Sequence, residues 1–93
     1  MKLPDSALIP PHVLARQVGD ETVILNLESG VYFGLDSVGA RIWKLLAEGN
    51  NLVRICEKMQ LEFQVDPETL EKDVKRLVHE LEDKGLIIPM VNT

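Results

Sequence analysis

The strongest constraint on the fold is a change of hydrophobic period at Asp36. Residues 31–35 alternate from one face to the other with the period of a strand, Tyr32 and Gly34 lying opposite the apolar set. Directly behind them, residues 38–46 place apolar side chains at helical spacing, and Asp36 or Ser37 is a suitable helix N-cap. The chain therefore runs straight from a strand into a helix here, and we predict strands before this point and helices after it.

Two further strands are predicted upstream. Residues 12–18 alternate weakly, and residues 22–27 alternate more clearly and begin with β-branched side chains. Residues 19–20 and 28–30 are turn sequences that suit hairpins. We expect a three-stranded antiparallel meander whose last strand lies on an edge. The apolar residues of the second strand share one face: Val23, Leu25 and Leu27.

Three helices are predicted downstream. The first ends at Glu48-Gly49, the second starts after Asn50 or Asn51, and the third covers Pro67 to Lys84 behind Asp66 as its cap. Residues 61–65 alternate, which indicates an extended connector with Leu61, Phe63 and Val65 turned inward. The buried stripe of the third helix comprises Leu70, Val74, Leu77, Val78 and Leu81.

The order of elements predicts the fold class and the domain organisation. A three-stranded antiparallel sheet followed by three helices is an α+β arrangement of the winged-helix kind. At 93 residues the chain forms one small domain. We place that domain at residues 12–88, after an extended lead-in over residues 1–11 that carries three prolines and is mobile at its first residues. Residues 89–93 form a fraying tail.

The inventory of reactive groups is thin. The histidines, His12 and His79, stand alone without metal-ligand spacing, and the single cysteine, Cys56, sits on the apolar stripe of the second helix as a buried, inert thiol. We therefore expect no catalytic residues, no metal and no cofactor, and so no enzyme. The sequence shows no apolar run of membrane-spanning length and no signal peptide, so we expect a cytoplasmic protein without a membrane partner.

A peptide-binding groove is the better-supported prediction. An edge strand over residues 31–35 can accept another chain as an added strand, and Gly34 lets a foreign backbone approach closely. At 100° per residue, four polar side chains cluster beside the buried stripe of the last helix: Thr69, Asp73, Arg76 and Glu80. If that flank faces the edge strand, the two form a groove with an apolar floor of Leu77, Phe33 and Leu35. The residue pattern alone leaves open a plainer interpretation, in which Tyr32 is a surface residue and Asp73 and Arg76 an exposed pair.

The run from Gly30 to Trp43 resembles the PqqD-like family, whose usual form is a Gly, an aromatic pair, Leu-Asn, then Gly-Ala and Ile-Trp. The later Asp73-Val74, with Leu77, Leu81 and the ending Gly85-Leu86-Ile87, is similar to that family's last helix. The resemblance covers roughly residues 12 to 88. Asp36 stands where asparagine is common, which is a mild departure.

The resemblance implies a recognition element for ribosomally made, later modified peptides (RiPPs). Such modules capture the leader segment of a precursor peptide as a strand added to their third strand, against their last helix, and present it to separate enzymes. Carried over by position, the binding residues are Val31, Tyr32, Phe33, Gly34 and Leu35 on the strand and Asp73, Arg76, Leu77 and Glu80 on the helix. Thr69 belongs to the same flank by spacing alone.

The same stretch resembles the stand-alone modules of lasso-peptide pathways more than the protein of the pyrroloquinoline quinone (PQQ) pathway. The first branch implies a leader peptidase and a cyclase as partners, and the second implies a radical-SAM enzyme. An exposed edge strand can also pair with its own copy, so we expect a monomer or a weak homodimer.

A DNA-binding winged helix is the alternative from another functional class. A DNA reader needs a basic recognition helix. The last helix instead mixes four basic with six acidic residues, and the whole chain carries a net charge of −5. We therefore expect no nucleic-acid partner.

Overall fold

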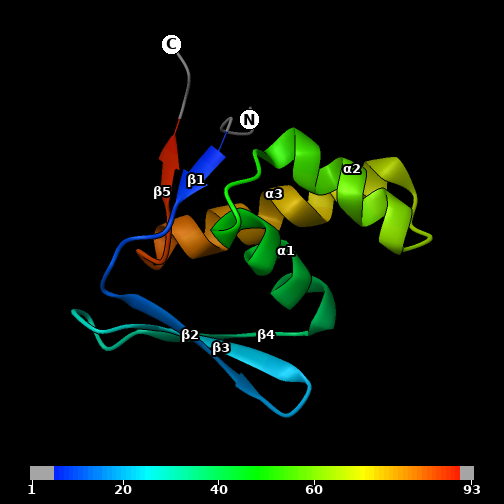
Figure 1. Cartoon of the computed structure of the whole chain (residues 1–93). Coiled ribbons are helices and arrows are strands. Elements are labelled where there is room, and N and C mark those ends of the chain that lie inside the picture. Colours follow the sequence, from blue (N-terminus) through cyan, green and yellow to red (C-terminus); the bar gives the residue numbers. More distant parts are fainter. Residues whose placement is uncertain (1–5, 91–93) are drawn as a thin grey trace.

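A computed structural model describes residues 6–90 of the chain. Figure 1 shows three helices stacked on one face of a twisted sheet, with a small second sheet formed near the two termini. The elements follow the order β1 (Ser6–Leu8), β2 (Val13–Val18), β3 (Glu21–Asn26), β4 (Tyr32–Leu35), α1 (Ser37–Ala47), α2 (Leu52–Glu62), α3 (Pro67–Asp83) and β5 (Ile88–Met90). The predicted α+β class, three antiparallel strands followed by three helices, is confirmed.

The main sheet has the strand order β2-β3-β4, so β4 lies at its edge as predicted. In its register Ile24 lies opposite Phe33 and Thr22 opposite Leu35. The inward face of β3 is the opposite of the apolar set found in the sequence: Ile24 is fully buried, whereas Leu27 is 57% exposed. The alternation shows that the two faces of the strand differ, but it does not show which face the helices cover. The inward face includes the polar residue Asn26, which is buried, so the sequence pattern pointed to the other face as the apolar one.

Each helix begins with a side chain that accepts a hydrogen bond from a backbone N–H of the first turn. Asp36 Oδ1 accepts from Gly39 at 2.8 Å, Asn51 Oδ1 from Arg54 at 2.8 Å, and Asp66 Oδ2 from Thr69 at 3.1 Å. The first of these turns is tightly packed, because a Cβ added at Gly39 would lie 3.2 Å from Leu35 Cδ2. Glycine therefore lets the end of β4 pack directly against the start of α1.

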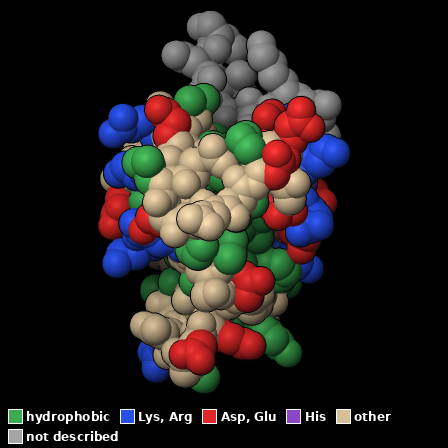
Figure 2. Space-filling view, turned by 90° about the vertical axis from the view of Figure 1, so that its right-hand side faces the viewer, with side chains coloured by type: hydrophobic (Ala, Val, Ile, Leu, Met, Phe, Trp, Pro, Cys, Tyr) green, Lys and Arg blue, Asp and Glu red, His purple; other side chains and the backbone are tan. Residues whose placement is uncertain are grey.

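One hydrophobic core joins the helices to the inward face of the sheet. Its fully buried members come from the expected stripes, among them Ile42, Ile55, Met59, Val74 and Leu81. Leu77 and Cys56 are half-buried at the margin of this core. Figure 2 shows one side of the molecule. Hydrophobic side chains gather there between the helices and the sheet, and charged side chains lie at both flanks. Each fully buried aliphatic side chain stabilises the fold by about 1.5–3 kcal/mol.

The connector between the last two helices is shorter than predicted. Helix α2 continues to Glu62, so Leu61 lies within the helix and is 88% exposed instead of turned inward. Phe63 and Val65 do pack against the core. Arg41 on α1 binds both carboxylate oxygens of Glu62, at 3.0 and 2.9 Å, and this ion pair holds the end of α2 against α1. The alternation over residues 61–65 is too short to distinguish the end of a helix from an extended segment.

A two-stranded sheet near the termini was missed from the sequence. Strand β1 pairs antiparallel with β5, with Ser6 opposite Met90 and Leu8 opposite Ile88. These segments were interpreted as part of the unpaired lead-in and of the tail, because their prolines disfavour strands. Pro89 nevertheless lies within β5. The fraying tail was predicted over residues 89–93, but Pro89 and Met90 pair with β1 in β5. Residues 91–93 and the first five residues, predicted to be mobile, lie outside the described range.

Candidate functional site

A groove of about 300 Å³ lies between β4, the start of α1 and the middle of α3. Phe33, Leu35 and Leu77 are among its apolar lining residues, as expected from the sequence. In all, seven of the ten sequence-predicted residues line this groove: Phe33, Gly34, Leu35, Asp73, Arg76, Leu77 and Glu80. The flank of the last helix therefore does face the edge strand.

The start of α1 forms part of the groove, which sequence reasoning missed. Asp36, Val38, Gly39 and Ile42 also line it. Asp36 is occupied as the cap of α1, and Val38 extends the apolar surface beside Leu35. The sequence did contain this information, because a helix that starts directly after an edge strand must place its first turn beside the end of that strand.

Three expected residues lie outside the groove. Val31 precedes β4 and is 36% exposed. Tyr32 is 72% exposed and pairs with Leu25, and the alternation of the strand turns both side chains toward the face that no helix covers in Figure 1. Thr69 shares the angular flank of Asp73 but lies about one turn nearer the start of α3, where its backbone N–H and its hydroxyl both donate to Asp66 Oδ2.

The outer edge of β4 presents backbone groups to a further strand. Asn26 N–H donates to the carbonyl of Val31 at 2.8 Å, so this carbonyl faces β3 as in a hydrogen-bonded pair, although the N–H of Val31 donates to Ser29 Oγ. Because such pairs alternate along antiparallel strands, Phe33 also bonds to β3, while the N–H and C=O groups of Tyr32 and Gly34 point outward. Within residues 6–90, the sheet has no strand beyond β4.

Charges of alternating sign follow α3 along the groove. Arg76 Nη2 lies 3.3 Å from Asp73 Oδ1, and Glu80 follows on the next turn. Just past the helix end, Lys84 Nζ lies 5.5 Å from the centre of the Phe33 ring, a cation–π contact. Exposed pairs of this kind stabilise the fold by at most about 1 kcal/mol, so their charges remain available to a ligand.

The titratable side chains that line the groove are Asp36, Asp73, Arg76 and Glu80. No cluster of three or more metal-ligating His, Cys, Asp or Glu side chains occurs in the described part of the chain. Cys56 lies elsewhere, half-buried between α2 and α3, where burial and then the negative charge of Glu71 raise the pKa of its thiol. His12 contacts Glu28 at 3.2 Å, beside the turn that follows β3.

Among residues 6–90, the helices are too short or too polar to cross a lipid bilayer.

Comparisons with known proteins bear on this site. The family model for coenzyme PQQ synthesis protein D (PqqD) matches residues 21–87. A solved structure described as TbiB1 in complex with the TbiA(beta) leader peptide is 38% identical, with a TM-score of 0.83 over 91% of this chain and 99% of that one. A lasso peptide synthetase B1 complexed with the leader peptide is 25% identical, with a TM-score of 0.82 over 90% and 99%. No curated protein matches the chain significantly.

Proposed function

This chain belongs to the PqqD family, and from that premise we propose that it is a RiPP recognition element that binds the leader segment of a ribosomal precursor peptide. The observation that carries the proposal is the groove between β4 and α3, because it lies beside an edge strand with outward backbone groups. Both solved structures described above hold a leader peptide, and the likeness extends over about nine-tenths of this chain.

In this proposal the leader adds as a strand to the outer edge of β4. Its backbone bonds to the outward groups of Tyr32 and Gly34, and these bonds supply affinity that depends little on sequence. Every second leader side chain enters the groove and packs on Phe33, Leu35 and Leu77. The charges of the α3 wall then select among leaders, because an ill-matched charge is repelled at close range.

We assign the chain to a lasso-peptide pathway. The solved structure that is 25% identical is a lasso peptide synthetase B1, and the run from Gly30 to Trp43 resembles the stand-alone modules of lasso-peptide pathways. The partners are then a leader peptidase and a cyclase, to which the chain presents the leader without catalysing a step itself. The alternative is a peptide chaperone that serves a radical-SAM enzyme in PQQ synthesis, which the description of the family model favours.

The proposal places the chain where ribosomal precursors are made, in the cytoplasm. The groove uses residues of one chain, so a monomer suffices for binding. A weak homodimer through β4 would compete with the leader, because both need the same edge.

Fluorescence anisotropy with labelled leader peptides tests the proposal. The set contains leaders of lasso precursors, a PQQ precursor peptide and a DNA duplex. We expect saturable binding of a lasso leader, weakened by Asp73→Ala. Glu71→Ala is the matched control, because Glu71 also forms an ion pair on α3, at 3.1 Å to Lys75, but lies on the opposite flank. Binding of the PQQ peptide alone would favour the alternative pathway. Binding of DNA alone, or equal losses in both variants, would contradict the proposal.

A further inference from the structure

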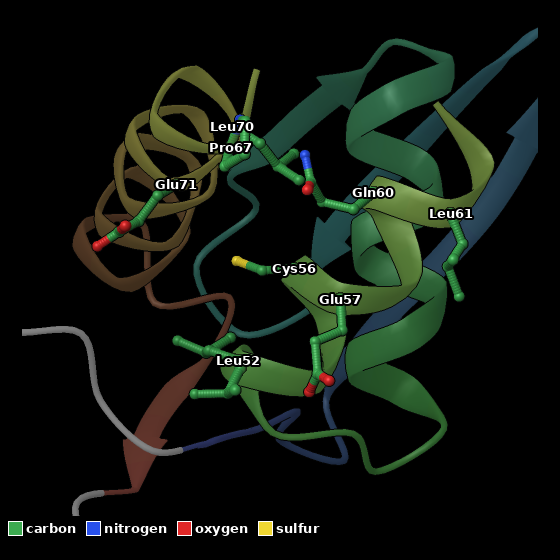
Figure 3. Close-up of a pocket in the computed structure, with 9 residues that line it drawn as sticks. Leu52, Cys56, Glu57, Gln60, Leu61, Pro67, Leu70 and Glu71 are labelled. Carbon is green, nitrogen blue, oxygen red and sulfur yellow. The ribbon is translucent and has the colours of Figure 1, made fainter. Parts of the chain in front are cut away.

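A second hollow, of about 630 Å³, lies between α2 and α3. Figure 3 shows Cys56 pointing into it, with Leu52 and Leu70 at its two ends. At 100° per residue, Pro67 and Glu71 of α3 lie on the other side of the buried stripe from Asp73 and Glu80, and Leu70, which also lines the hollow, belongs to the stripe itself. The hollow is therefore a surface separate from the β4–α3 groove.

The hollow is apolar and remains open to solvent. Leu52 and Leu70 are buried at its floor, whereas Val53 is 69% and Leu61 88% exposed at its margin. Leaving two large aliphatic side chains in water forgoes the stabilisation that their burial would give. Such a patch beside a cavity is typical of an interaction surface.

The charges at this hollow are of one sign. Glu57 and Glu71 line it from opposite helices, and no Lys or Arg side chain lines it in the described part of the chain. Glu71 is paired with Lys75 at 3.1 Å, so the acidic charge offered to an occupant is mainly that of Glu57. The effect of Glu71 reaches inside, because after burial its charge is the next cause of the raised pKa of the Cys56 thiol. An occupant should therefore carry cations beside an apolar anchor.

The shape of the hollow suits a helix. The lining residues of α2 follow two ridges at a spacing of four, 52–56–60 and 53–57–61. At 1.5 Å per residue these ridges extend for roughly 13 Å, or two to three helical turns. Because no strand of residues 6–90 lines the hollow, an extended peptide would find no strand edge to pair with in this part of the chain, whereas a helix satisfies its own backbone.

We propose that the α2–α3 hollow docks an amphipathic helix of a partner protein, with an apolar stripe flanked by Lys or Arg. A second copy of this chain is the poorer occupant, because an isologous contact would bring Glu57 and Glu71 of both copies together. The proposal does not depend on leader binding, since it uses the opposite flank of α3.

An NMR titration with two synthetic helical peptides tests the docking site. Both peptides carry leucines on one face, and the flanking residues are lysines in one and glutamates in the other. We expect the lysine peptide to shift amide signals of α2 and the first turns of α3, and Leu61→Lys to weaken its binding about tenfold by removing an apolar contact and adding a like charge. Leu14→Lys, an exposed leucine on the sheet, is the matched control and should leave the affinity unchanged.

A charge reversal completes the test. Glu57→Lys should weaken the lysine peptide about two- to fivefold and strengthen the glutamate peptide, as expected for a partly exposed ion pair. Saturating leader peptide should change neither affinity, so this result stands whether or not the leader proposal does. Equal binding of both peptides, shifts confined to the sheet, or no binding at millimolar peptide would overturn the proposal.

Discussion

The side-chain amide of Asn26 donates a 3.1 Å hydrogen bond to the backbone carbonyl of Gly85 and so connects the end of β3 to the end of α3. Its Oδ1 atom accepts from the N–H groups of Glu28 and Ser29, at 2.9 and 3.1 Å. Gly85 has a positive φ of 70°, as expected of a residue that terminates a helix. This buried amide therefore connects the sheet, whose edge strand β4 forms one wall of the groove, to the end of α3, which forms the other.

Removal of that amide should destabilise the protein. Asn26→Ala leaves two N–H groups and one carbonyl without their partner, at a cost of about 1–3 kcal/mol for each group that water cannot reach. We expect the free energy of unfolding to fall by roughly 2–4 kcal/mol in urea titration. Ser29→Ala, which removes an exposed hydrogen bond to Val31 from the same turn, should cost less than about 1 kcal/mol. Equal losses would mean that Asn26 has no special role.

Strand addition makes a prediction about the backbone of β4. Tyr32→Pro removes an N–H that points away from β3, so we expect leader affinity to fall about tenfold or more while the ladder to β3 survives. Tyr32→Ala keeps that N–H and should change the affinity little, because the side chain lies outside the groove. Anisotropy and urea titration measure both quantities.

The neighbouring position gives the opposite pattern. Phe33→Pro removes an N–H that bonds to β3, so it should destabilise the fold itself. If Tyr32→Pro bound the leader as well as the native chain does, addition of the leader at this edge would be wrong.

The position of Leu77 separates binding from stability. Leu77 is half-buried in the groove, whereas Leu81, one turn later, is fully buried in the core. Leu77→Ala should cost less than about 2 kcal/mol of stability and weaken leader binding about fivefold. Leu81→Ala should cost roughly 2–5 kcal/mol and leave the affinity of the folded fraction unchanged. Equal stability losses would place Leu77 in the core and remove it from the site.

Most of the fold followed from short-range patterns. The change of period at Asp36 and the helix caps are local features. The structure has the cap of α3 at Asp66 as predicted, and for α1 and α2 it has Asp36 and Asn51, each one of the two candidates that the sequence left open. The groove was predictable for a related reason, since helical spacing gathers Asp73, Arg76 and Glu80 on one flank. Helical spacing shows which residues share a flank even when the strand or helix that packs against that flank is unknown.

The errors concern contacts between distant segments. The pairing of β1 with β5 joins residues eighty or more positions apart, and neither three-residue segment shows a pattern by itself. The inward face of β3 depends on Asn26, whose burial is possible because Gly85 and the following turn satisfy it. Whether Thr69 lines the groove depends on which turns of α3 lie beside β4. Local periodicity contains no information on which distant segments pack against one another.

The thiol of Cys56 tests the environment between α2 and α3 through pH. Burial, and then the charge of Glu71, raise the pKa of this thiol. Because the thiolate is the reactive form, the midpoint of its alkylation rate against pH should lie above that of a cysteine in an unfolded peptide. The folded state also keeps this proton longer than the unfolded one, so the thiol's contribution to stability is present at neutral pH and lost as pH rises from the unfolded pKa through the folded one. Glu71→Gln should lower the midpoint, whereas Glu57→Gln, which also lines the hollow, should leave it in place. A native midpoint at or below that of the unfolded chain would mean that the thiol is neither shielded from water nor near a negative charge.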